Sequence, residues 1–291
     1  RGRHWRPLHG NLPLGLRDRE IDLVRGLSVD PRDADRVVIV GGGGGGASKG
    51  GAAVTRDGGK TWRATLAACF YGNGRRRMLG RVIDRDPFDP DRLVVGEDWD
   101  GLFVSRDGGE TWRKTGPEGH WFTDVRHDRT VRGRLYASAP PVEPKLLGNW
   151  QFTDEMRRTP RQTGFYRSDD GGETWRQVSD AAPDEIVQVA GSSALVGIFG
   201  RRHVRQSTDG GATWTAFDAG LPPPAPDGLG YPKRGVRLEL GAGRDFWVLG
   251  DSTGVFHRRG LSDAAWSTLP LPRCALGAPQ KETFLARHCG K

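Results

Sequence analysis

Residues 97–100 (EDWD) place three carboxylates around the indole of Trp99. An indole can stack on the apolar face of a pyranose, and carboxylates can bind sugar hydroxyls or act as general acid and base. We therefore predict Asp98 and Asp100 as candidate catalytic residues and Trp99 as a sugar-binding platform. The alternative is a solvated hairpin loop whose tryptophan packs on its neighbour, and the sequence leaves both open.

The segment 140–162 is a second candidate, because it interrupts an otherwise compact pattern of short strands. Long insertions of this kind are usually functional or flexible. We predict Asp154 and Glu155 as further candidate catalytic residues, with Trp150 and Phe152 as sugar-binding aromatics. The alternative is a loop that only shields the edge of a sheet.

Two smaller groups complete the candidate binding residues. Tyr71 and Arg75 lie in the run 71–77 (YGNGRRR), whose arginines could bind an acidic sugar or pair with nearby carboxylates. His120 and Trp121 form the other group, although a histidine beside a tryptophan is more often a packing residue than a catalytic one.

The sequence predicts neither a metal site nor a cofactor. No second Cys or His stands at zinc-binding spacing. The glycine run 41–46 lacks the Gly-Lys-Ser/Thr of a phosphate-binding loop and precedes an expected strand, not a helix.

The elements that must position these residues follow from a phrase of eight residues, S/T-x-D-x-G-x-T-W. It occurs at residues 55–62 (TRDGGKTW), 105–112 (SRDGGETW), 168–175 (SDDGGETW) and 207–214 (STDGGATW). Its aspartate is expected to accept hydrogen bonds from its own turn, its glycine to permit a positive φ, and its tryptophan to begin the next strand as a buried wedge. The aspartates are therefore predicted to be structural, at positions Asp57, Asp107, Asp170 and Asp209.

The tryptophan that ends this phrase recurs at positions 5, 62, 112, 175, 214 and 266, in steps of 57, 50, 63, 39 and 52 residues. One four-stranded blade per step predicts an all-β chain and a single β-propeller domain over residues 1–291. Six blades are expected, with seven or five as alternatives, and one blade combines the strand at Trp5 with residues 274–291. Before Trp266 the phrase is degenerate, with Leu261 in place of the aspartate, so packing is expected to hold that hairpin.

This arrangement also predicts where a binding site belongs. The phrase should form turns at the outer rim of one face. The loops between second and third strands, and the connections between blades, should gather on the opposite face. All candidate sugar-binding residues lie in such loops or connections, so we predict a functional face opposite the structural turns.

Composition narrows the partners and the location. The 44 Lys and Arg residues against 36 Asp and Glu give a net charge of +8, but the basic residues are scattered among acidic ones, so no nucleic-acid partner is expected. No apolar run of about 18 residues exists, so no membrane span is expected. A start at Arg1 fits a trimmed chain, and a bond between Cys274 and Cys289 would favour a secreted or periplasmic protein; inert thiols, with Cys69, are the alternative.

The repeated phrase resembles the Asp-box (BNR repeat) of sialidases, sortilin-type receptors and glycoside hydrolase family 74 xyloglucanases. Residues 73–112 are similar to a family 74 blade. The resemblance implies a β-propeller and a glycoside hydrolase-like protein that acts on or binds a polysaccharide. The family's acid and base lie in segments without a counterpart here, so neither is assigned to a residue of this chain.

Two other functions are alternatives to this one. A sialidase is disfavoured, because no Arg-Ile-Pro phrase precedes the first box and no arginine triad can be assigned. The alternative from another class is a non-enzymatic scaffold that binds a protein partner, like the sortilin or photosystem-assembly propellers.

Overall fold

The computed structural model describes residues 12, 23–42, 50–68, 70, 80–97, 101–141, 162–200, 203–222, 236–241, 245–250 and 254–269. Their regular secondary structure consists entirely of β-strands. The all-β prediction is therefore confirmed for these ranges.

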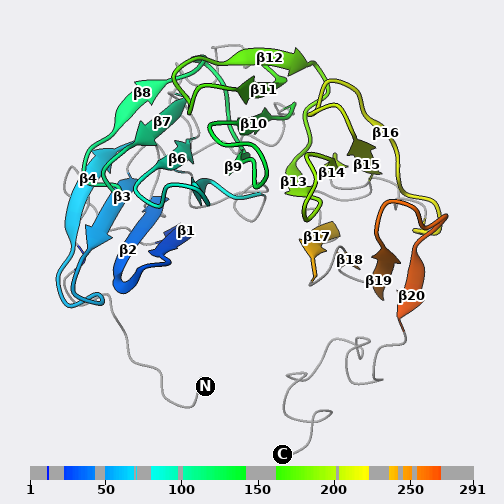
Figure 1. The fold of residues 1–291 in the computed structure, drawn as a ribbon, viewed down its shortest axis with the longest axis horizontal. Coiled ribbons are helices and arrows are strands. Elements are labelled where there is room, and N and C mark those ends of the chain that lie inside the picture. The colour runs from blue at the N-terminus through cyan, green and yellow to red at the C-terminus, as the bar shows by residue number, and fades with distance from the viewer. Residues whose placement is uncertain are drawn as a thin grey trace, which may run out of the picture. The chain divides into compact units, whose positions relative to one another are not determined.

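The strands form five sheets, which we number as blades one to five (Figure 1). Each sheet contains four strands that follow one another in the sequence and pair in that order. Blade one contains β1 (Leu23–Asp30), β2 (Asp33–Gly42), β3 (Gly50–Thr55) and β4 (Arg63–Ala67). Blade two contains β5 (Ile83–Arg85), β6 (Leu93–Gly96), β7 (Leu102–Ser105) and β8 (Arg113–Thr115). Blade three contains β9 (Asp124–His127), β10 (Leu135–Ala139), β11 (Gly164–Ser168) and β12 (Arg176–Ser179).

The remaining two sheets have the same order. Blade four contains β13 (Glu185–Gln188), β14 (Leu195–Phe199), β15 (His203–Ser207) and β16 (Thr215–Ala216). Blade five contains β17 (Val236–Leu240), β18 (Asp245–Gly250), β19 (Gly254–Arg259) and β20 (Ser267–Leu269). Five blades thus lie within the described ranges, and the residues expected to build a sixth, around Trp5 and at 274–291, fall outside them.

The chain divides into two compact units, residues 1–185 and 186–291. In the first unit, one apolar core joins blades one and two through Val38, Val54 and Ile83, and a second joins blades two and three through Val104 and Val125. In the second unit, one core joins blades four and five. The prediction of a single domain over the whole chain stays a prediction.

Two ends can be distinguished in every sheet, because its neighbouring strands run antiparallel. The turn between the first two strands and the Asp-box between the last two lie at one end, which we call the box end. The loop between the middle strands and the connections to adjacent blades lie at the other, the loop end. The Asp-boxes thus lie at the box end of each blade, whereas most of the candidate sugar-binding residues fall outside the described ranges, so a functional face opposite the boxes stays a prediction.

Candidate functional site

The Asp-box hairpins are held by their own polar atoms. In the second box, Asp107 accepts the backbone N–H of Thr111 at 2.9 Å and its hydroxyl at 2.5 Å, while Ser105 donates to the carboxylate at 2.8 Å. Both box glycines have positive φ, 78° at Gly108 and 94° at Gly109. Equivalent bonds recur in the boxes of Asp57, Asp170 and Asp209, so the prediction that each aspartate accepts hydrogen bonds from its own turn is confirmed.

The box tryptophans differ from the expected buried wedge. Trp112 is half-buried and packs against the core shared by blades one and two. Its Nε1 donates to Thr65 of blade one at 3.1 Å and to Gly109 at 3.0 Å. The box thus contacts the preceding blade as well as closing its own hairpin.

The degenerate hairpin of blade five uses a carboxylate that sequence analysis missed. Asp263 Oδ2 accepts the backbone N–H of Arg259 at 2.9 Å, two positions beyond the leucine that replaces the usual aspartate. Trp266 is 4% exposed, and its Nε1 donates to the carbonyl of Phe217 at 2.6 Å. The expectation that packing alone holds this hairpin was therefore incomplete.

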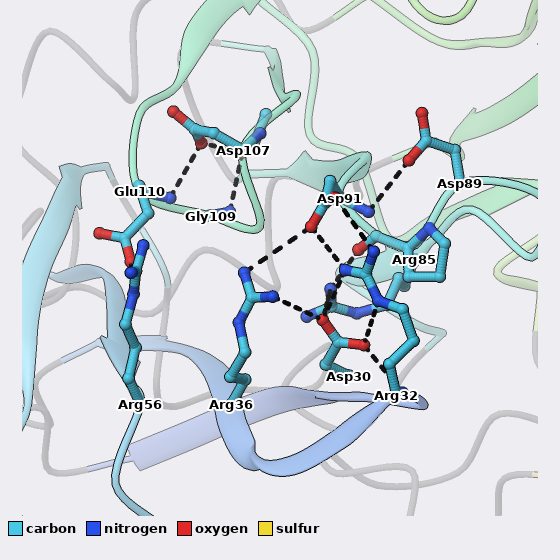
Figure 2. A network of polar contacts seen from close by, with 12 residues as sticks. Asp30, Arg32, Arg36, Arg56, Arg85, Asp89, Asp91, Asp107, Gly109 and Glu110 are labelled. Carbon is cyan, nitrogen blue, oxygen red and sulfur yellow. Dashed lines mark hydrogen bonds and ion pairs between the residues drawn. The ribbon is translucent and has the colours of Figure 1, made fainter.

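A network of arginines and aspartates joins blades one and two at their box ends (Figure 2). Arg32 binds Asp30 at 2.8 Å and reaches Asp91 of blade two at 2.6 Å. Arg36 lies 3.4 Å from Asp30 and 3.7 Å from Asp91. The hydrogen bond from Arg32 lowers the pKa of Asp30 to about 2, against the opposing effect of burial. These groups bind one another, which indicates a contact between blades and not a ligand site.

The loop end of blade two is closed by a residue of the EDWD loop itself. Glu97 is fully buried, and its Oε1 accepts the backbone N–H of Gly101 at 2.8 Å. The Glu97 N–H donates to the Gly101 carbonyl at 3.1 Å. One of the three carboxylates therefore supports the base of the loop. Asp98, Trp99 and Asp100 fall outside the described residues, so their predicted roles stay predictions.

The base of the blade-three insertion is also described. Ala139 pairs with Gly164 across β10 and β11. Gln162 forms a parallel bridge with His120, and its N–H donates to the Gly119 carbonyl at 3.3 Å. The predicted site residues of this insertion, Trp150, Phe152, Asp154 and Glu155, lie outside the described residues. The same holds for Tyr71 and Arg75, in the connection between blades one and two.

The connection 116–123 runs from blade two to blade three and forms hydrogen bonds with the first residue of the EDWD loop and with residues at or beside both ends of the insertion. On one side the Phe122 N–H donates to the Glu97 carbonyl at 3.3 Å. On the other, the Thr123 N–H donates to the Ser138 carbonyl at 2.9 Å, next to the insertion. The two segments that sequence analysis selected separately are thus attached to one short stretch of backbone.

His120 and Trp121 lie in this connection, and the structure places both side chains in the interior, at 1% and 6% exposure. His120 Nδ1 lies 2.7 Å from the carbonyl oxygen of Glu118, and Nε2 lies 2.6 Å from the hydroxyl of Tyr166. Burial lowers the pKa of His120 and raises the pKa of Tyr166. A role for His120 in fixing the connection follows directly from these contacts, whereas its predicted contact with substrate stays a prediction.

Within the described ranges, no cluster of three or more His, Cys, Asp or Glu side chains is arranged to bind a metal ion. The same ranges contain no helix of the length and apolar character needed to cross a membrane.

Comparison with known proteins identifies the repeat. The model of the BNR/Asp-box repeat matches residues 103–114 and 166–177. No curated protein matches the chain by sequence.

The following three are examples of solved structures that share the fold. The family 74 xyloglucanase of Xanthomonas campestris superposes with a TM-score of 0.64 at 18% identity, over 88% of this chain and 40% of that chain. The family 74 enzyme of Niastella koreensis gives 0.58 at 18% identity, over 86% and 38%. YCF48 bound to D1 peptide gives 0.54 at 12% identity, over 91% and 72%.

At these identities the likeness concerns the fold, and the chain spans about two fifths of the length of the family 74 enzymes. Structural neighbours thus include both glycoside hydrolases and a peptide-bound propeller. The repeats and the four-stranded blades lead to one conclusion: the chain carries BNR/Asp-box repeats, and its fold is that of a β-propeller.

Proposed function

We propose that this chain is a secreted, glycoside hydrolase-like protein that binds a polysaccharide at the loop ends of blades two and three. The observation that carries the proposal is the common attachment of two segments to the connection 116–123. The bond from Phe122 to Glu97 fixes the base of the EDWD loop, and the bond from Gln162 to Gly119 fixes the base of the insertion.

The composition of the two segments supports a sugar ligand. The sequence of each contains a tryptophan close to two carboxylates: Trp99 with Asp98 and Asp100, and Trp150 with Asp154 and Glu155. Aromatic rings bind the apolar faces of sugar rings, and carboxylates bind their hydroxyls. Carboxylates contributed from two sides of a bound chain could also serve as general acid and base.

Xyloglucan is the first ligand to test, because the family 74 enzyme from Xanthomonas campestris is a xyloglucanase. Titration calorimetry with xyloglucan, mixed-linkage glucan and an acidic polysaccharide measures binding. We expect Trp99→Ala to weaken binding about tenfold or more, the effect of losing an aromatic contact of about 1.5 kcal/mol.

Phe88→Ala is the matched control. Phe88 is a 36% exposed aromatic in the turn between β5 and β6, at the box end of the same blade. Its removal is expected to leave polysaccharide affinity unchanged. If both variants bind as the native protein does, Trp99 is not in the site. If the native protein binds none of the polysaccharides, the proposal fails and the alternative of a scaffold for a protein partner is favoured.

Cleavage is a separate measurement. Release of reducing ends from the bound polysaccharide is compared among Asp98→Asn, Asp100→Asn, Asp154→Asn and Glu155→Gln. If an acid and a base act from opposite sides of the ligand, one variant in the EDWD loop and one in the insertion should lose turnover but keep affinity. Binding without release of reducing ends would make the protein a glycan-binding module instead of an enzyme.

A further inference from the structure

The connection 116–123 is fastened to blade three by one pair of side chains. Tyr166, on β11, places its hydroxyl 2.6 Å from Nε2 of His120, and the two rings meet edge to face at 5.0 Å. Phe122 stacks on the histidine at 5.6 Å. His120 and Tyr166 are only 1% and 5% exposed, so the two side chains meet in the interior of the protein.

The hydrogen-bond partners define where the protons lie. The Glu118 carbonyl oxygen, 2.7 Å from His120 Nδ1, can only accept, so Nδ1 carries a hydrogen. In the neutral imidazole Nε2 is then the acceptor, and the Tyr166 hydroxyl donates to it. Burial lowers the pKa of His120, which favours this neutral form.

Protonation of His120 would reverse the direction of this bond. Nε2 would donate to the Tyr166 oxygen, and the hydroxyl would donate to Oε1 of Gln177, 3.2 Å away. Three charged side chains belong to the segments around this network. Asp180 accepts from Gln177 at 2.7 Å, Glu118 pairs with Lys114 at 2.8 Å, and Glu97 is buried at the end of β6. A positive charge would then lie in a buried position.

The backbone near His120 carries the contacts to both segments. Gly119 accepts from Gln162 at the base of the insertion, and Phe122 donates to Glu97 at the base of the EDWD loop. Both residues lie within two positions of His120. A rotation or shift of the histidine would therefore move both attachments together.

We propose that the His120–Tyr166 pair is a positioning contact that fixes the connection 116–123 and, through it, the backbone bonds at Glu97 and Gln162 from which the EDWD loop and the insertion start. The role of the two segments in binding a ligand rests on the proposed polysaccharide function, but the fastening itself does not. Because the connection carries the bonds to both Glu97 and Gln162, loss of the pair should weaken both bonds at once.

Tyr166→Phe tests the contact, because it removes the hydroxyl and keeps the ring. Tyr136→Phe is the matched control: this buried tyrosine of β10 donates to Asp128 Oδ2 at 2.9 Å, at the box end of the same sheet. NMR hydrogen exchange of the Phe122 and Gln162 amides needs no ligand. We expect both amides to exchange about tenfold faster in Tyr166→Phe, as for one lost hydrogen bond, and at the native rate in Tyr136→Phe.

Polysaccharide affinity provides the second readout, with xyloglucan as the probe. Tyr166→Phe is expected to bind about tenfold more weakly, and Tyr136→Phe as the native protein does. His120→Gln keeps an oxygen that can accept from Tyr166 but does not ionise. Its affinity should match the native value at about pH 7.5 and stay constant to about pH 5, whereas native affinity falls as the histidine gains a proton.

The outcomes separate the two proposals. Native exchange rates at Phe122 and Gln162 in Tyr166→Phe would overturn the positioning role. Faster exchange combined with no xyloglucan binding by the native protein would support the fastening and overturn the polysaccharide function. If the affinity of His120→Gln depends on pH as that of the native protein does, protonation of His120 does not cause the pH dependence.

Discussion

Glu110 in the Asp-box of blade two accepts a hydrogen bond from Arg56 in the Asp-box of blade one (Figure 2). The distance from Arg56 Nε to Glu110 Oε1 is 2.5 Å. Arg63, which follows the tryptophan of that first box, binds the same carboxylate. The pattern recurs one blade later, where Glu173 binds both Arg106 and Arg113. In both pairs of blades, therefore, the glutamate of the later box binds one arginine of the earlier box and the arginine that follows that box.

Removing the charge of Glu110 should weaken the contact between blades one and two. We expect Glu110→Gln to lower the free energy of unfolding by about 0.5–1 kcal/mol, since exposed ion pairs contribute about 0.2–1 kcal/mol each. The loss should shrink in about 1 M salt, which screens exposed charges. Urea denaturation at two salt concentrations measures both effects.

Glu118→Gln is the control for this change, because Glu118 pairs with Lys114 only four residues away. Glu118→Gln should lower the free energy of unfolding less than Glu110→Gln does, because the pair of Glu118 and Lys114 does not connect two blades. Equal losses in the two variants would mean that the bond between boxes adds nothing beyond an ordinary surface pair.

The box aspartates should make stability sensitive to acid. Hydrogen bonds from Thr61 lower the pKa of Asp57 to about 2. Burial opposes the shift at Asp209, but hydrogen bonds from Thr213 still lower its pKa to about 2. Both pKa values lie below 3.8, the usual pKa of an aspartate. Between about pH 2 and pH 4 the folded chain therefore binds fewer protons than the unfolded chain.

The contribution of these aspartates is therefore fully present above about pH 4 and lost as pH falls towards 2. Denaturation midpoints measured from about pH 6 to pH 2 should show this decline, and Asp209→Asn should make it shallower. An unchanged slope in that variant would contradict the assignment of the acid response to the box.

The two ends of blade two should respond to mutation in opposite ways. Asp107→Ala leaves the backbone N–H groups of Glu110 and Thr111 without their acceptor, which should cost about 1–3 kcal/mol of unfolding free energy. Polysaccharide affinity should not change. Asp98→Ala should instead weaken binding or turnover and shift stability by less than about 0.5 kcal/mol. The reverse result would place the functional residues at the box end.

How far the sequence predicts this structure depends on the distance between interacting residues. The Asp-box could be predicted because Asp107, its glycines and Thr111 lie within a few positions. Sequence analysis missed the bond from Arg56 to Glu110, although both positions stand within the repeated phrase. The pair His120 and Tyr166 could not be inferred, because its residues lie 46 positions apart and meet only when β11 packs beside the connection.

The second glycine of the box should be required for the approach of two blades. Gly109 has a φ of +94°, and a Cβ there would lie 2.8 Å from Cγ2 of Val38 and 3.3 Å from Cγ1 of Val54, both in blade one. Gly260, with a φ of +67°, has no atom within 4 Å of the same position. Both substitutions to alanine incur the backbone cost of a left-handed residue, about 1–2 kcal/mol, but only Gly109→Ala adds a collision.

We expect Gly109→Ala to lose about 1–3 kcal/mol more unfolding free energy than Gly260→Ala, the usual range for overpacking. Val38→Ala should be less destabilising in the Gly109→Ala background than in the native chain, because the smaller side chain relieves the collision. Urea denaturation of the two single variants, the double variant and the control measures this coupling. Additive losses would show that Gly109 is needed only for its backbone conformation and not for the contact between blades.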